Sequence, residues 1–277
     1  MWILLAAALG GFLIPRLNRL IPATVLCLAL ILAFHGQVLS GSGVLNIVLI
    51  GLLVAARYRY RGNEAWVIGN EVILLLCCLG LFLHLLPGFH NPRVVDDIVA
   101  GPLSARFDLY FNLDKALVPV ILLACIPTLF NGAIHTPRRW YVWCMLALSI
   151  PALLGLAVWL GGLRVEPHFP SWLGQFMLSN LFFVALAEEA LFRGYLMQRL
   201  QKYTHHNGLA LMTSAAIFGL AHIAGGWLLV IFAALAGVIY GLAWLWSGKL
   251  WVATLFHFML NLIHLMFFTY PFYRPGG

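Results

Sequence analysis

Three ionisable side chains, Glu188, Glu189 and Arg193, lie inside an apolar run at residues 181–200 that is otherwise typical of a membrane-spanning helix. Each such group in the middle of a membrane helix raises the free energy of insertion by roughly 2.5 to 3.5 kcal/mol. The presence of all three therefore calls for a structural or functional explanation. Glu189 and Arg193 are four residues apart on one helical face and can form an ion pair. Glu188 is turned about 100° away and has no such partner in its own helix. A purely structural ion pair leaves Glu188 unexplained, so we interpret the group as a catalytic or ion-handling site.

Two further polar pairs follow in later apolar runs. Phe218 and His222 are four residues apart in SAAIFGLAHIAGG, and His257 and Asn261 are four apart in LFHFMLNLIH. Each pair therefore shares one face of its helix. A single histidine in a membrane helix is often only a packed core residue. Two histidines and an asparagine that follow a buried glutamate pair predict that these side chains converge on one site.

The spacing of these residues along the chain tests whether they lie at a common depth. If residues 205–208 (HHNG) form the turn of a helical hairpin, Glu188 and His222 lie about eighteen and sixteen residues from it and reach similar depths. His257 is only about eight residues beyond the turn at 247–249 on the same side. The last helix is therefore expected to begin deeper, unless its hairpin projects from the membrane.

The other histidines are not expected to act in catalysis. His264 is seven residues beyond His257, and we expect it to pack or to make an interfacial contact. The remaining ones lie in loops or at the ends of apolar runs: His35, His84, His90, His135, His168, His205 and His206.

The composition is that of a membrane protein. Of the 277 residues, 63% are hydrophobic and 9% are charged, which no soluble domain of this size shows. Many apolar runs lack the alternation of a barrel strand and are longer than such a strand needs. We therefore expect an all-α fold: a polytopic transmembrane helix bundle of about 8–10 spans with a buried polar site in its C-terminal helices.

Ten apolar runs are candidate spans. The first lacks the basic start of a signal peptide, so we interpret it as an uncleaved span. The first three runs are short, which leaves their boundaries open. The runs cover residues 1–14, 20–34, 43–56, 65–86, 116–133, 140–162, 173–197, 209–223, 227–246 and 250–269.

Basic residues gather on one side of this arrangement. With the loop RYRYR at 57–61 in the cytoplasm, ten of the sixteen basic residues lie on that side, five lie on the other, and Arg193 lies in the membrane. The cytoplasmic set is completed by Arg16, Arg19, Arg138, Arg139, Arg199, Lys202 and Lys249. Orientation in a membrane thus accounts for the net charge of +7, and we expect no nucleic-acid partner. We expect a multi-pass protein of the cell membrane, specifically of a bacterial inner membrane, with both termini outside.

The longest polar segment divides the chain. Residues 1–114 are expected to hold four N-terminal spans and a long polar loop, 87–114, which either covers the site or only connects spans. Residues 115–277 are expected to form the functional core. Glu71, near the cytoplasmic end of the fourth span, is expected to snorkel or to cap a polar contact. The five cysteines lack metal-site or disulfide spacing and are interpreted as core residues: Cys27, Cys77, Cys78, Cys125 and Cys144.

The three motifs together resemble those of a known family. The chain contains EExxxR at Glu188, FxxxH at Phe218 and HxxxN at His257, in that order. In this it resembles the CPBP family, the CAAX-protease and bacteriocin-processing intramembrane endopeptidases also called Abi or Rce1-like. The resemblance covers residues 173–269.

This resemblance implies a glutamic-type intramembrane endopeptidase that needs no cofactor. Carried over to this chain, Glu188 is the general base and His222 helps it to hold water. His257 and Asn261 stabilise the oxyanion. The supporting residues are Glu189, Arg193 and Phe218. The implied partner, besides the lipid bilayer, is a peptide or protein at the membrane, with or without a lipid anchor, such as a CAAX-like tail, a leader or a sorting signal.

Two alternatives stay open. Two histidines and a glutamate are also a common zinc set, although no HExxH is present. A non-enzymatic membrane protein, such as an immunity factor or a transporter, also uses buried acids and histidines to bind a partner or relay protons.

Overall fold

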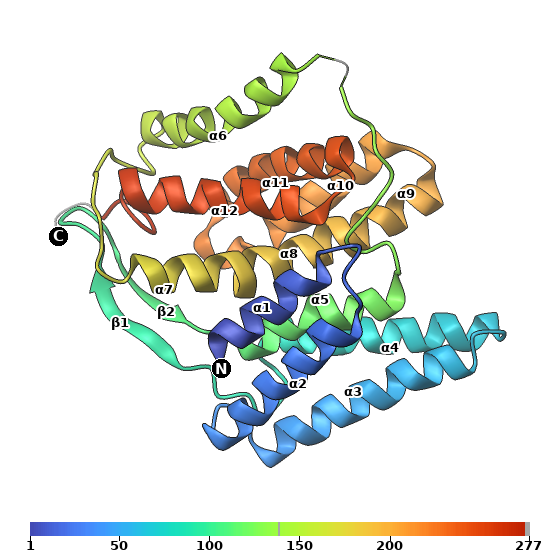
Figure 1. Cartoon of the computed structure of the whole chain (residues 1–277). Coiled ribbons are helices and arrows are strands. Elements are labelled where there is room, and N and C mark those ends of the chain that lie inside the picture. The colour runs from blue at the N-terminus through green and yellow to red at the C-terminus, as the bar shows by residue number, and fades with distance from the viewer. Residues whose placement is uncertain (138, 275–277) are drawn as a thin grey trace.

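The computed structural model describes residues 1–137 and 139–274 as a bundle of helices with one small sheet (Figure 1). The N-terminal helices are α1 (Trp2–Phe12), α2 (Leu20–His35), α3 (Gly41–Arg59), α4 (Glu64–Phe82) and α5 (Leu113–Cys125). The C-terminal ones are α6 (Tyr141–Trp159), a rod at Leu173–Thr204, α10 (Asn207–Leu220), α11 (Trp227–Ser247) and α12 (Leu250–Phe267). The described residues thus form ten helices, which confirms the expected polytopic helical bundle.

Six of these helices are long and apolar enough to cross a membrane: α3, α4, α6, the rod, α11 and α12. The other four have 11 to 16 residues, and at 1.5 Å per residue they are too short to span about 30 Å of hydrocarbon unaided. The expected run at 116–133 is interrupted because its helix ends at Cys125, just before Pro127. Ten apolar runs therefore correspond to ten helices, but not to ten full-length spans.

The rod Leu173–Thr204 is the most enclosed of the long helices. In its most apolar stretch 67% of residues are buried, against 17 to 22% in α3, α4 and α6, whose apolar side chains face outward. The rod consists of α7 (Leu173–Leu178), α8 (Leu186–Glu189) and α9 (Gln198–Thr204), separated by the wider π-helical turns η1 (Ser179–Ala185) and η2 (Ala190–Met197). Such π turns inside helices are frequent at functional sites. The two glutamates thus lie on a short α-helical segment between two widened ones.

Small residues bring α10 and α11 into close contact. A side chain at Gly237 would come within 3.1 Å of Ala215, and one at Gly241 would collide with Leu211 on α10. The spacing of these glycines, GxxxG, is the pattern by which membrane helices approach closely. This pairing places the motif residues of α10 beside the rod and α12.

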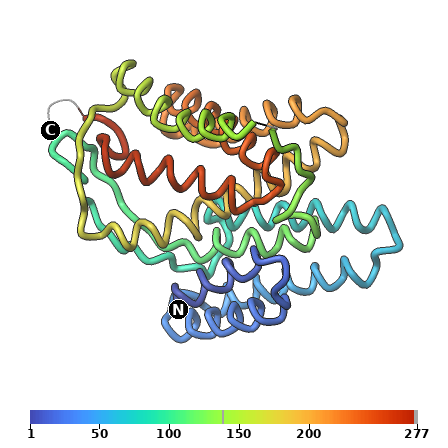
Figure 2. Tube along the Cα trace, turned by 45° about the horizontal axis from the view of Figure 1, so that its top comes forward, coloured from blue at the N-terminus to red at the C-terminus, as the bar shows by residue number. Residues whose placement is uncertain are grey.

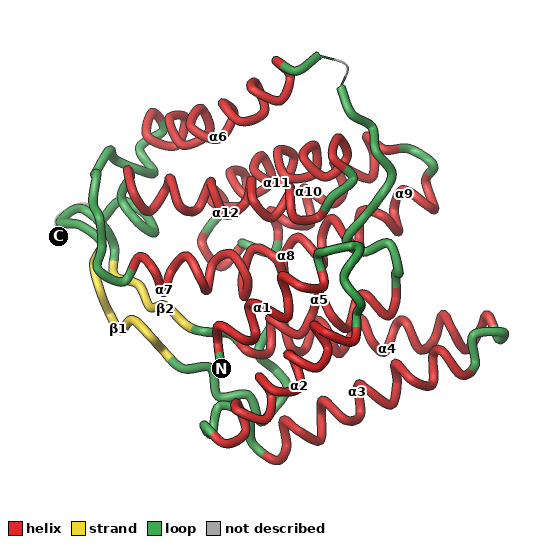
Figure 3. Tube along the Cα trace, viewed as in Figure 1, coloured by secondary structure: helices red, strands yellow, loops and turns green. Residues whose placement is uncertain are grey.

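The polar loop at 87–114 contains a β-hairpin that sequence reasoning did not anticipate. Strands β1 (Arg93–Val99) and β2 (Arg106–Tyr110) pair antiparallel, with register shifts in β1 (Figure 3). Val95 and Leu109 are buried against Trp172 at the start of the rod, together with Phe176 and Leu265. The segment therefore packs on the ends of the rod and α12, and the alternation of apolar residues in RVVDDIV and RFDLY was the signal for it.

The bundle has two different ends (Figure 2). The end that carries the β-hairpin, residues 160–172 and residues 268–274 is called the hairpin end. The opposite end carries the turns α3–α4, α9–α10 and α11–α12 and is called the basic end. A single apolar cluster includes buried residues from helices on both sides of residue 114, and the division into two domains at that residue stays a prediction.

Candidate active site

The polar motif residues meet at one cavity. Glu188 of α8, His222 just after α10, and His257 and Asn261 of α12 all line a cavity of about 440 Å³. Its other walls are mostly apolar side chains from α6 and α11. A cavity of this size and lining is typical of a ligand site, with few polar groups among many apolar ones. The predicted convergence of these residues on one site is therefore present in the structure.

The two glutamates have different environments, as the helical wheel predicted. Glu189 is fully buried, and its Oε1 lies 2.9 Å from Nη1 of Arg193. Glu188 is 8% exposed and lines the cavity, and Nε2 of His257 lies 3.9 Å from its Oε2. That separation is too long for a direct hydrogen bond. Glu188 is thus held beside a histidine without being neutralised by an arginine.

His257 is the residue that joins the two glutamates. Its Nδ1 lies 2.8 Å from Oε1 of Glu189, and this contact directs Nε2 toward Glu188. The ring stacks on Tyr240 of α11, with centroids 4.5 Å apart and planes 11° apart. Sequence reasoning gave Glu189 a supporting role only in general terms. The structure adds a specific role, because the same oxygen that accepts from Arg193 also fixes the orientation of the imidazole.

Arg193 is fully buried and is held by both polar and aromatic groups. Its Nη2 donates a 3.0 Å hydrogen bond to the backbone carbonyl of Gly237, and its guanidinium lies 4.5 Å from the ring centroid of Phe218 and 5.3 Å from that of Tyr240. A buried arginine needs such partners because removing its charge from water is costly. The phenylalanine of the FxxxH motif therefore contacts the arginine of the EExxxR motif.

His222 lies at the end of α10 with one ring nitrogen engaged. Its Nδ1 lies 2.8 Å from the carbonyl oxygen of Phe218, one turn earlier. Because a carbonyl only accepts, Nδ1 is the donor, and Nε2 is left available as an acceptor. The ring also packs on Phe218 at 4.7 Å between centroids. This arrangement makes His222 suited to hold a water molecule in the cavity.

Asn261 is held by an amide that sequence reasoning missed. Its Nδ2 donates to Oδ1 of Asn180, a residue of η1, at 3.3 Å. Asn180 and Tyr240 are both polar side chains inside apolar runs, which was the signal for them in the sequence. Neither belongs to a motif, and only packing of the rod, α11 and α12 brings them to the site.

The C-terminal segment closes part of the cavity. Pro271 and Phe272 line it, together with His264. Nε2 of His264 lies 3.1 Å from the carbonyl oxygen of Thr269, so the residue makes the local contact that was expected of it. Burial raises the pKa of the hydroxyl of the adjacent Tyr270 to about 12.

The depth of His257 is explained by the segment after α5. Backbone hydrogen bonds join Gly132 to Gly248 and Leu250 to Phe130, so this segment covers the turn between α11 and α12. Leu250, the first residue of α12, is fully buried. The last helix therefore begins inside the protein, which is the first of the two arrangements that the sequence allowed.

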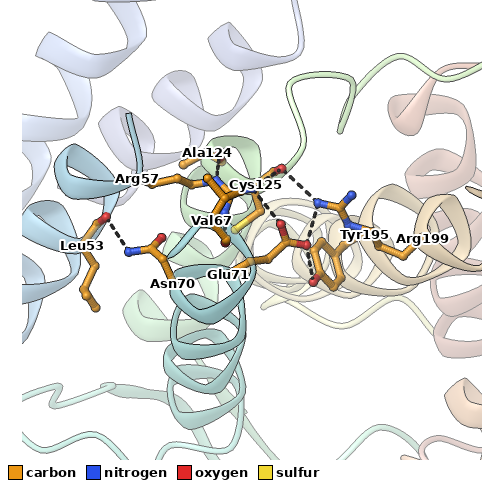
Figure 4. Close-up of polar contacts among 9 residues, drawn as sticks. All are labelled: Leu53, Arg57, Val67, Asn70, Glu71, Ala124, Cys125, Tyr195 and Arg199. Atoms are coloured by element: carbon orange, nitrogen blue, oxygen red, sulfur yellow. Dashed lines mark hydrogen bonds and ion pairs between the residues drawn. The ribbon is translucent and has the colours of Figure 1, made fainter. Parts of the chain in front are cut away.

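A second polar cluster is centred on Glu71, which is not among the residues that line the cavity (Figure 4). Glu71 of α4 accepts from Nη2 of Arg57 at 2.7 Å, from the hydroxyl of Tyr195 at 2.9 Å and from Nη2 of Arg199 at 2.6 Å. Arg57 also donates to the backbone carbonyls of Val67 and of Ala124 and Cys125 in α5. The expected polar contact of Glu71 is thus a network that joins α3, α4 and α5 to the rod.

Within residues 1–137 and 139–274, no group of three or more His, Cys, Asp or Glu side chains is arranged to hold a metal ion. The five cysteines are free thiols. Arg138, which the sequence places in a basic loop, lies outside the described residues.

Comparison with known proteins agrees with this geometry. Residues 170–263 match the family described as type II CAAX prenyl endopeptidase Rce1-like, and this segment contains every residue of the three motifs. Neither a curated protein nor a solved structure matches the chain significantly. The family match supports a CAAX-type protease embedded in the membrane, hence a hydrolase acting on a peptide or protein. This match, over residues 170–263, supports the resemblance of the chain to the Rce1-like CPBP family.

Proposed function

We propose that the protein is an intramembrane endopeptidase in which Glu188 activates a water molecule for attack on a peptide bond. The observation that carries this proposal is the convergence of Glu188, His222, His257 and Asn261, from three separate helical segments, on one largely apolar cavity. A carboxylate that faces a cavity can accept a proton from a water molecule held there. A purely structural acid gains nothing from facing such a cavity.

Glu188 and His222 act on the water. Glu188 accepts a proton as the water oxygen bonds to the carbonyl carbon of the substrate, and Nε2 of His222 accepts the other water hydrogen bond. When the carbon–nitrogen bond breaks, Glu188 returns the proton to the leaving amine. General acid–base catalysis of this kind contributes about 10²- to 10⁴-fold to a rate.

His257 and Asn261 stabilise the negative charge on the carbonyl oxygen. Each is pre-oriented by a neighbour, His257 by Glu189 at 2.8 Å and Asn261 by Asn180 at 3.3 Å. Preformed donors in a water-poor site are worth about 3 kcal/mol each in the transition state. Because Nδ1 of His257 faces Glu189, donation by Nε2 requires a ring that carries a proton on both nitrogens.

The substrate is a peptide or protein held at the membrane. A helix hides its carbonyl groups in internal hydrogen bonds, so the scissile segment must be extended when it reaches the cavity. A CAAX-like tail, lipidated or not, a leader peptide and a sorting signal all satisfy this requirement. The apolar walls fit apolar side chains next to the cleaved bond.

The reaction needs no cofactor in this proposal. Hydrolysis by purified protein should therefore be unchanged after dialysis against a strong chelator. A zinc mechanism using Glu188, His222 and His257 instead predicts a loss of activity that returns when zinc is added back.

The decisive experiment compares new peptide termini in membranes from cells that express the wild type, Glu188→Gln or His222→Ala. The proposal predicts a set of termini that is present with the wild type and absent with both variants at equal protein levels. If both variants leave these termini and the phenotype intact, the protein is a non-enzymatic binding or immunity factor instead.

A further inference from the structure

The cavity is strongly asymmetric along the axis of the bundle. In α6, α11 and α12 its lining lies at residues 153–157, 228–240 and 257–264, toward the hairpin end of each helix. None of the lining residues lies in the remaining part nearer the basic end, at 141–152, 241–247 and 250–256. The cavity therefore extends from the motif residues toward one end of the molecule only.

The floor and the mouth of the cavity are made of different groups. Glu188, Tyr240 and His257 form the floor, and behind them Arg193 and Trp244 are almost wholly buried. At the other extreme the lining includes Gly162, Gly225 and Phe272, which lie in the connections and tail at the hairpin end. Phe272 is 57% exposed. The motif residues are thus reached from the hairpin end and are sealed from the basic end.

The mouth is formed by the C-terminal segment 268–274, which is hydrogen-bonded to two loops, at residues 103–105 and 164–166. The backbone of Phe272 accepts from Ala105, and that of Arg164 accepts from Thr269. The buried carboxylate of Glu166 accepts from the backbone nitrogen of Leu103 at 2.7 Å and from the hydroxyl of Ser104. Three chain segments therefore hold the rim of the cavity at the hairpin end.

Charge distinguishes the two ends. In the described residues, the basic end and its loops carry nine basic side chains: Arg16, Arg19, Arg57, Arg59, Arg61, Arg139, Arg199, Lys202 and Lys249. The hairpin end has five basic residues and five acidic ones, among them Asp96, Asp97 and Asp108 of the β-hairpin. Lysine and arginine in short loops stay on the cytoplasmic side of a membrane. The basic end is therefore the cytoplasmic end, and the hairpin end faces outward.

We propose that the site takes its substrates from the noncytoplasmic side: membrane-anchored polypeptides that present an extended, apolar segment at the outer surface, next to their anchor. This inference rests on the proposed function and assigns it a substrate class, since it excludes tails that are confined to the cytosol. Glu188 is fifteen residues along the rod from Leu173, roughly 22 Å at 1.5 Å per residue, so the cleaved bond lies below the outer surface.

The side of the opening is tested by thiol labelling of the full chain in its membrane. Phe272→Cys is placed in a background whose five native cysteines are replaced by alanine, and a membrane-impermeant maleimide is added to intact cells or to inside-out vesicles. We expect labelling in intact cells to exceed that in inside-out vesicles at least tenfold. The matched control, Arg61→Cys in the α3–α4 turn, is expected to show the reverse preference. Labelling of Phe272→Cys only in inside-out vesicles, or in detergent alone, would overturn the proposal.

A second measurement separates this inference from the proposed function. Each new terminus that disappears with Glu188→Gln is mapped to a side of the membrane from the orientation of its own protein. Termini on the noncytoplasmic side support the inference. Termini on the cytoplasmic side refute it and leave the peptidase intact, whereas termini unaffected by Glu188→Gln refute the peptidase itself.

Discussion

Two glutamates inside the bundle, Glu71 and Glu188, show how the same residue type is used differently. At Glu71 both carboxylate oxygens are engaged, by Arg57, Tyr195 and Arg199. Glu188 instead lies 3.9 Å from Nε2 of His257, and its carboxylate faces a cavity. A network in which every polar group has a partner makes the packing around it rigid. A carboxylate that faces a cavity can still contact a substrate or a water molecule there, and such groups are typical of functional sites. The difference between a structural and a reactive acid is therefore in its partners and not in its burial.

The first way to break this comparison is to neutralise each acid in turn. Glu188→Gln should lower the rate of peptide hydrolysis about 10²- to 10⁴-fold with little change in thermal stability, because it removes the base without removing a contact. The matched variant Glu71→Gln should lower stability and leave kcat within a few-fold of the wild type. The rate of peptide hydrolysis and the thermal unfolding of both variants, measured in detergent, test the two expectations. Equal losses of activity in both variants would contradict the division of roles.

Removing the arginine tests whether Glu189 belongs with the structural acids. Arg193→Met should destabilise the protein by about 3 to 5 kcal/mol, because it leaves the fully buried Glu189 uncompensated beside His257. Thermal unfolding measures this loss. The double variant Arg193→Met with Glu189→Gln should recover part of it, and Arg61→Met in an exposed turn should be neutral. A single variant as stable as the wild type would mean that the buried pair contributes nothing.

The amide on α12 should act on catalysis and not on substrate binding. Asn261→Ala removes an amide that lines the cavity, and we expect kcat to fall about 10²-fold while KM changes little. Asn46→Ala is a suitable control, since Asn46 bonds to the carbonyl of Pro87 far from the cavity. A rise in KM at constant kcat would assign Asn261 to substrate binding instead.

The smallest expected effect concerns the cluster around Glu71. Tyr195→Phe deletes one hydrogen bond to Glu71 and leaves both of its ion pairs, so we expect about 1 to 2 kcal/mol of destabilisation. Activity should stay within twofold of the wild type. Unfolding midpoints and steady-state rates of the same preparation test this. A large loss of activity at unchanged stability would show that the cluster acts on the site through the rod.

Much of the arrangement was predictable from local spacing. The i, i+4 positions of Glu189 and Arg193 predict their ion pair, and the structure has it at 2.9 Å. The helical bundle follows from apolar runs that leave the backbone no other way to satisfy its hydrogen bonds in lipid. The β-hairpin was missed because its alternating strands are short and lie in a segment that length and polarity alone mark as a loop.

The sequence by itself determined which helices form and which polar residues share a helical face, because both depend on neighbours within a turn or two of the same chain. Only the tertiary structure decided that Glu189 holds His257, that Asn180 holds Asn261, and that Phe272 lines the cavity that contains Glu188. These contacts join residues from about seventy to more than eighty positions apart. The reason is geometric: no periodicity within one helix specifies which face of a distant helix packs against it, or at which end the packing leaves space.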